Sequence, residues 1–195
     1  LPEQAVQAIV ESAFQSAGQR CSALRCLYIQ EDVAEEFQRM LIGAMQALQI
    51  GDPWHLSTDV GPVIDEAARA GIAAHIETAR NENRLIAELL TPDNGTYIAP
   101  TIIKLNAISD LEHEIFGPVL HVVTFKSNEL DKVITAINAT GYGLTFGLHT
   151  RIDDRVQYVS KRIEAGNIYI NRNQIGAIVG SQPFGGEGLS GTGPK

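Results

Sequence analysis

The sequence of 195 residues has few of the features that mark several large classes of protein. Only two cysteines are present, Cys21 and Cys26, which excludes a disulfide framework and, without a secretory signal, indicates a reducing compartment such as the cytoplasm. Basic residues are outnumbered, with 15 Lys and Arg against 23 Asp and Glu, so nucleic acid is not an expected partner. Apolar runs such as 119–123 fall far short of the roughly 20 residues that cross a bilayer, so we expect a soluble protein without a membrane span.

Patterns that bind metals are missing as well. The five histidines never occur in His-x-x-x-His spacing, and two cysteines alone cannot form a zinc knuckle, so no metal site is predicted. Gly186, Gly188 and Gly191 have the spacing of a dinucleotide fingerprint, but that motif must directly follow a strand and open a helix, with an acidic residue about 20 positions later. These glycines lie close to the last residue, so we interpret them as a glycine-rich turn instead.

Helical and strand periodicities alternate along the chain, which favours an α/β fold over a helical bundle or a β-sandwich. With 44% hydrophobic residues, the chain is long enough for one domain over residues 1–195 that buries a single core. The first residue is Leu1 rather than methionine, and we therefore expect a piece of a longer protein. Residues 171–195 include seven glycines and few apolar anchors, which predicts a long loop that either binds a ligand or is disordered; the apolar residues Ile175, Ile178, Val179 and Phe184 argue against pure disorder.

The spacing of apolar residues and of turn residues predicts the individual elements. Helices are expected at about 2–17, 32–48, 65–80, 130–137 and 156–163, with Asp32 capping the second. Strands are expected at about 26–30, 85–90, 97–105, 119–125, 146–150 and 168–171.

Cys21 is the best candidate nucleophile that the residues themselves indicate. It lies between a helix that Gly18 ends and a buried strand, so its sulfur has access to a cleft, and the neighbouring Arg20 would favour the reactive thiolate. The competing interpretation is a small buried side chain, because free cysteines are among the most buried residue types. Cys26 begins an apolar strand, and there the interpretation as a core residue is favoured.

Five segments along nearly the whole chain resemble, in order, the successive motifs of the aldehyde dehydrogenase superfamily. They are GQRCSALR at 18–25, EIFGPVL at 114–120, YGLT at 142–145, GNIYIN at 166–171 and PFGGEGLSGTG at 183–193. The first and last are most similar to the L-glutamate γ-semialdehyde (Δ1-pyrroline-5-carboxylate) dehydrogenases of proline catabolism. The resemblance implies the catalytic, nucleophile-bearing domain of that family, with a mostly parallel sheet flanked by helices and a glycine-rich C-terminal anchor loop.

The resemblance implies that Cys21 is the catalytic nucleophile of an NAD-dependent oxidation. Its thiolate would attack the aldehyde, the thiohemiacetal would pass a hydride to NAD, and water would hydrolyse the thioester, while the Cys21 backbone N–H forms half of an oxyanion hole. Glu114 and Phe116 match the cofactor-binding positions that hold the nicotinamide ribose. On residue type alone, Glu114 would be a solvated charge and Phe116 a core residue.

The substrate that the resemblance implies is an aldehyde with an α-amino acid head, whose carboxylate needs hydrogen-bond donors. The matching substrate-binding positions are Arg20 and Ser22 beside the nucleophile, Gly176 and Ala177 in the anchor loop (residues 174–180), and Phe184, which would pack on the aliphatic chain. The alternative for these positions is an ordinary turn with a core phenylalanine, since loops rich in glycine are often only connectors.

The resemblance also implies parts that this chain does not contain. The general-base glutamate, the second oxyanion donor and most of the NAD site belong to upstream segments of the family, and FAD would occur only in a proline dehydrogenase domain of the parent protein. We expect the chain alone to have little dehydrogenase activity and the parent to be a cytoplasmic homo-oligomer. The alternatives are another NAD(P)-dependent aldehyde dehydrogenase and a non-catalytic association domain.

Overall fold

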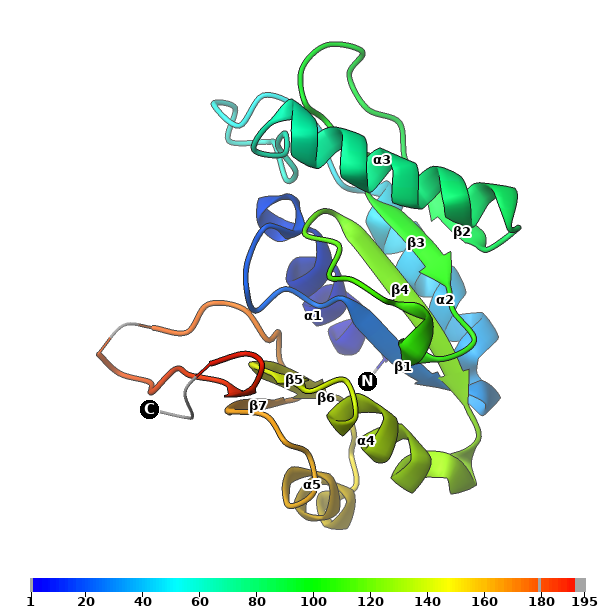
Figure 1. Cartoon of the computed structure of the whole chain (residues 1–195), viewed down its shortest axis with the longest axis vertical. Helices are drawn as coiled ribbons and strands as arrows, with labels where there is room; N and C mark the ends of the chain where they lie inside the picture. The colour runs from blue at the N-terminus through cyan, green and yellow to red at the C-terminus, as the bar shows by residue number, and fades with distance from the viewer. Residues whose placement is uncertain (1, 179, 192–195) are drawn as a thin grey trace.

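The structure is a computed structural model that describes residues 2–178 and 180–191 (Figure 1). Its main sheet has the strand order β1 (Cys26–Gln30), β4 (Val119–Phe125), β3 (Thr101–Lys104) and β2 (Leu85–Glu88). β1 and β3 run parallel to β4, whereas β2 is antiparallel to β3. The predicted α/β fold with mostly parallel strands is confirmed; the end of the last motif, 192–193, lies outside the described residues.

Helices cover both faces of this sheet. α1 (Pro2–Phe14) and α2 (Glu31–Gln46) pack together behind it, and α3 (Glu66–Asn81) lies on the opposite side (Figure 1). β4 is the central strand, and its first five residues, 119–123, are all buried. A strand covered on both faces is expected to be almost continuously apolar, which explains why the bounds of β4 are predicted correctly from the sequence.

A second, smaller group of elements follows β4. It contains α4 (Leu130–Asn138), α5 (Asp153–Ser160), the parallel pair β6 (Thr145–Leu148) and β7 (Asn167–Ile170), and the short antiparallel pair β5 (Tyr142–Gly143) and β8 (Glu187–Gly188). Buried apolar residues form a large cluster around the main sheet and a small one around Ile134, Val159 and Ile163. The core therefore has two parts, not the single core expected, because the described strands β6 and β7 pair with each other and not with the main sheet.

The first residue of α1 is predicted correctly, but its last residue, on the side that leads to Cys21, is not. α1 begins as expected but ends at Phe14, where the short 3-10 helix η1 (Gln15–Gly18) takes over. Ser16 and Ala17 have positive φ angles of 56° and 53°, which an α-helix cannot contain. The chain therefore leaves the helix axis earlier than the apolar periodicity predicts.

The predicted cap of α2 is wrong. β1 runs directly into this helix without a loop, so Gln30 occupies the N-cap position and makes no side-chain cap bond. Asp32 instead lies in the first helical turn, where its carboxylate accepts a hydrogen bond from the Gln30 side chain at 2.6 Å.

Two further 3-10 helices, η2 (Ile108–Asp110) and η3 (Ser127–Glu129), flank β4. None of the described helices is both long and apolar enough to cross a membrane.

A buried pair of histidines joins α3 to the central strand. His121 of β4 is fully buried, and its Nε2 lies 2.8 Å from Nε2 of His75. His121 Nδ1 lies 2.9 Å from the backbone oxygen of Arg25, which can only accept, so Nδ1 carries the hydrogen and His75 donates to His121 Nε2. Burial lowers the pKa of His121 to about 4, against a smaller opposite effect of the bond to Arg25, so His121 is neutral near pH 7.

This pair should make the stability of the chain depend on pH. A histidine with a lowered pKa in the folded state binds its proton more readily when unfolded, so its contribution is complete above pH 6.5 and is lost as the pH falls towards 4. In urea titrations, the free energy of unfolding should fall by roughly 3 kcal/mol across this window. His121→Asn should lose most of that dependence, whereas His55→Asn, at an exposed position, should keep it. A wild-type slope in His121→Asn would show that His121 is not the titrating group.

Candidate active site

The segment 18–25, called the nucleophile loop below, is held against a second loop, residues 114–118. Gly18 has a φ of 65°, and a Cβ at this position would overlap the carbonyl group of Gly117, so only glycine fits both the backbone conformation and the contact. The two loops directly precede β1 and β4, which are parallel neighbours in the main sheet. The strand pairing therefore brings the first two motifs together.

Cys21 lies in a tight turn of the nucleophile loop and is exposed. A hydrogen bond from the Ala23 N–H to the Arg20 carbonyl, at 3.0 Å, closes this turn. Cys26, by contrast, packs against the large core cluster, and burial raises its pKa to about 12. The two thiols therefore have different environments, one accessible and one in the core.

A hollow of about 440 Å³ opens beside Cys21. It is lined by Gln19, Arg20, Cys21, Ser22, Gly176, Ala177, Ile178, Gln182 and Phe184. All the residues that the resemblance assigns to substrate binding therefore meet around one hollow, although they come from opposite ends of the chain. The backbone N–H groups of Cys21, Gly176 and Ala177 have no hydrogen-bond acceptor among the described residues, and all three residues line the hollow.

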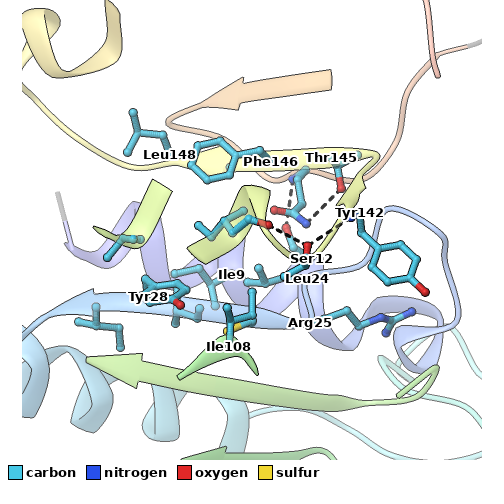
Figure 2. A pocket seen from close by; sticks show the side chains of 18 of the residues that line it. Ile9, Ser12, Leu24, Arg25, Tyr28, Ile108, Tyr142, Thr145, Phe146 and Leu148 are labelled. Carbon is cyan, nitrogen blue, oxygen red and sulfur yellow. Dashed lines mark hydrogen bonds between the residues drawn. The ribbon is translucent and has the colours of Figure 1, made fainter. Parts of the chain in front are cut away.

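Gln174 fixes the base of the anchor loop to the nucleophile loop. Its buried Nε2 donates to the Ser22 carbonyl at 3.2 Å and lies 3.3 Å from the Thr145 hydroxyl. Its backbone N–H donates to the Ser12 hydroxyl on α1 at 3.1 Å (Figure 2 labels Ser12 and Thr145). Through Gln174, these bonds connect α1, β6, the nucleophile loop and the anchor loop.

Asn167, at the start of β7, holds the chain on both sides of Phe184. Its Nδ2 donates to the Pro183 carbonyl at 2.8 Å, and its Oδ1 accepts from the Gly185 N–H at 3.1 Å. Because Asn167 is buried on a strand, the aromatic side chain between its two partners has a defined place in the hollow. Neither Asn167 nor Gln174 is predicted from the sequence as a site residue.

A larger groove, of about 910 Å³, also includes Cys21 in its lining. It runs between β1 and β6, where Tyr28 faces Phe146 and Leu148 across it (Figure 2). Glu114 and Phe116 line the same groove. Cys21 is therefore shared by the groove and the smaller hollow.

Arg25 contacts both residues that the resemblance assigns to the cofactor. Its Nε donates to Glu114 Oε1 at 3.0 Å, and its guanidinium carbon lies 4.7 Å from the centre of the Phe116 ring. Phe116 is 44% exposed and so is not the core residue that its type suggests. Glu114 Oε2 has no partner among the described residues, so it is available to accept a hydrogen bond from a cofactor hydroxyl, and the exposed Phe116 ring lines the same groove. Arg25 belongs to the first motif, but residue type and spacing alone give it no role.

The fold and the site define an α/β domain built around an accessible cysteine. The chain matches the aldehyde dehydrogenase family over residues 2–195, and it belongs to that family. It is 50% identical to the bifunctional protein PutA of Escherichia coli (strain K12), over 100% of this chain and 15% of that protein.

Solved structures give the same result. A mutant of Bradyrhizobium japonicum proline utilization A (PutA) superposes with a TM-score of 0.96 at 52% identity, over 100% of this chain and 20% of that one. The 1-pyrroline-5-carboxylate dehydrogenase from Thermus with bound NAD superposes with a TM-score of 0.89 at 32% identity, over 98% of this chain and 37% of that one. The chain therefore spans well under half the length of these relatives.

The two thiols should react with iodoacetamide at very different rates. Near neutral pH, Cys21 should be alkylated rapidly because it is exposed, whereas Cys26 should resist, since burial raises its pKa to about 12 and removes the reactive thiolate. Trypsin cleaves after Arg25, so mass spectrometry can follow each cysteine on its own peptide. Equal protection of both thiols would contradict an accessible Cys21 and favour the non-catalytic association domain.

Proposed function

We propose that the chain is the nucleophile-bearing catalytic part of an NAD-dependent L-glutamate γ-semialdehyde dehydrogenase, which oxidises this semialdehyde to L-glutamate in proline catabolism. The observation that carries the proposal is that one exposed thiol, Cys21, borders both the hollow and the groove. Hydride transfer from a substrate attached to sulfur requires a substrate site and a cofactor site that share this atom. The printed names of the relatives, PutA and 1-pyrroline-5-carboxylate dehydrogenase, support this particular substrate.

In the proposed reaction, the Cys21 thiolate attacks the aldehyde carbon and forms a C–S bond, which leaves a thiohemiacetal with a negatively charged oxygen. The Cys21 backbone N–H donates a hydrogen bond to that oxygen, as one half of an oxyanion hole. NAD, when bound, would supply the hydride acceptor for this carbon, and the carbonyl would form again as the C–H bond breaks. Water then cleaves the resulting thioester, which releases the carboxylate product and restores the thiol. The base that activates this water belongs to a family segment outside this chain.

The smaller hollow would bind the amino acid head of the substrate. In this proposal the N–H groups of Gly176 and Ala177 donate to its carboxylate, with Arg20 and Ser22 beside it, and Phe184 packs on the aliphatic chain. Two observations support this arrangement: the two N–H groups have no other acceptor among the described residues, and the hollow is lined by all five residues. Backbone donors that face the same hollow suit a carboxylate, which accepts several hydrogen bonds at once.

The groove would hold one end of NAD, with Glu114 accepting from the nicotinamide ribose and Phe116 lying beside it. The remaining NAD contacts would come from the parent protein, and FAD would belong to a separate proline dehydrogenase domain there. We further propose that the parent is a cytoplasmic homo-oligomer. The chain covers only 15% of the E. coli protein, and this supports the proposal that further NAD contacts and a separate FAD-binding domain lie elsewhere in the parent.

Replacing Cys21 in the full-length parent should abolish the oxidation. Cys21→Ala removes the nucleophile, so NADH formation from L-glutamate γ-semialdehyde, followed at 340 nm, should fall by at least about a thousandfold. Cys26→Ala is the matched control, because this thiol packs in the core and should leave most activity intact. Substantial turnover by Cys21→Ala would refute the proposed role.

A panel of aldehydes separates this proposal from another aldehyde dehydrogenase. The parent should prefer glutamate γ-semialdehyde over simple aldehydes of the same length without the amino acid head, by roughly a hundredfold or more, because donors built for a carboxylate are left unpaired by the simple aldehyde. Equal turnover of both would favour a different substrate for the same chemistry.

The isolated chain should form little or no NADH with the same substrate. It contributes the thiol and the hollow, but the base and most of the NAD contacts would come from the parent. Comparing equal molar amounts of chain and parent in one assay tests this expectation. Robust NADH formation by the chain alone would show that the upstream segments are dispensable.

A further inference from the structure

We infer that Arg25 is the positioning residue of this site: it holds the Glu114 carboxylate and the oxyanion-binding peptide of the nucleophile loop in one fixed geometry. This inference rests on the proposed function and deepens it. Arg25 lines the groove and acts through other groups, since its guanidinium donates to Glu114 and to the carbonyls of Gly18 and Arg20.

The first step is that the Arg25 guanidinium joins two separate loops. Its Nη1 donates to the Gly18 carbonyl at 2.6 Å and its Nη2 to the Arg20 carbonyl at 3.1 Å, both in the nucleophile loop. Its Nε donates to Glu114 in the other loop. All three nitrogen atoms are therefore engaged, and the side chain is only 14% exposed. A planar fork of donors suits this task, and lysine, with one nitrogen, cannot reproduce it.

The second step concerns the direction of the Cys21 N–H. The Arg20 carbonyl and the Cys21 N–H belong to the same peptide unit, which is planar and trans, so they point in opposite directions. Because the Arg20 carbonyl accepts from Arg25 and from the Ala23 N–H at 3.0 Å, the orientation of this peptide is set. The Cys21 N–H, which has no acceptor among the described residues, is thereby aimed away from the guanidinium.

The third step is that the backbone of Arg25 is also anchored. Its carbonyl accepts from the His121 N–H and from His121 Nδ1, each at 2.9 Å. Both ends of the residue are thus held by neighbouring groups of the buried central strand and of the two loops. A side chain fixed in this way can transmit the geometry of the sheet to groups that touch a ligand.

The fourth step is electrostatic. Burial lowers the pKa of Arg25, while Glu114 and, to a smaller extent, Cys21 raise it. Glu114 partly neutralises the guanidinium, so the electrostatic effect of Arg25 on the nucleophile loop depends on this carboxylate. Changing Arg25 or Glu114 should therefore change the reactivity of Cys21 in opposite directions.

The first experiment measures this coupling without NAD or substrate, as the alkylation rate of Cys21 by iodoacetamide in the parent protein at pH 7. Arg25→Met removes the positive charge and should slow alkylation about threefold, whereas Glu114→Gln leaves the charge uncompensated and should speed it about threefold. Glu114 is exposed, so this variant tests the inference even where Arg25→Met does not fold. Unchanged rates in the folded variants would overturn the inference.

The second experiment separates positioning from general stability. Arg25→Lys in the parent keeps the charge but loses the fork, so kcat/KM for NAD should fall about 10- to 100-fold and NAD binding by calorimetry should weaken, with Tm within a few degrees of wild type. The matched control is Arg39→Lys, because Arg39 pairs with Glu36 on the surface, at 72% exposure. In the double variant with Glu114→Gln the losses in NAD affinity should not add.

Two results separate this inference from the proposed function. Wild-type NAD binding and kcat in Arg25→Lys, or additive losses in the double variant, would show that Arg25 has only a structural role. A parent that oxidises no aldehyde would refute the proposed function, and the alkylation rates would still decide whether Arg25 couples the two loops.

Discussion

The parallel pairing of β1 with β4 is the constraint on which the site depends. Cys26 lies opposite His121 in this pair, so the residues just before each strand must lie side by side. The nucleophile loop and the loop 114–118 are those residues. A shift of one position in the register would turn every side chain of β1 to the other face and would move the Arg25 carbonyl away from its two donors on His121.

The same pairing explains why the site lies at the amino ends of the strands. In open parallel α/β sheets, ligands usually bind outside the carboxyl ends. Here the carboxyl end of β1 continues without a loop into α2, with Gln30 as the N-cap, so no binding loop can form there. The chain between α1 and β1, by contrast, includes the positive φ angles of Ser16 and Ala17, which turn it towards the amino end of β4. The backbone conformation of Ser16 and Ala17 and the parallel pairing of β1 with β4 therefore both place the site at the amino ends of these strands.

How much of this is predictable from the sequence depends on what each residue contacts. β4 is predicted with its observed bounds because burial on both faces leaves a continuous apolar signal, and Cys21 stands out by its chemistry and its motif. Asn167 and Arg25 are missed because their partners are mostly backbone atoms, such as the carbonyls of Pro183 and Gly18, which have no signature in residue type. The early end of α1 is missed because neither Ser16 nor Ala17 is a residue type that favours the left-handed φ angles that both adopt.

The carbonyls of the nucleophile loop show how a flexible turn becomes a defined site. Gly18 and Arg20 accept from Arg25 on one side, and Ser22 accepts from Gln174 on the other. Each bond fixes one planar peptide, so Arg25 holds the Arg20–Cys21 peptide and Gln174 holds the Ser22–Ala23 peptide. The cysteine is therefore exposed in a loop with a defined backbone: Cys21 borders both the hollow and the groove, while Arg25 and Gln174 donate to the carbonyls of the residues before and after it. Such an arrangement allows one sulfur to serve two binding sites, because neither site has to order the loop when a ligand arrives.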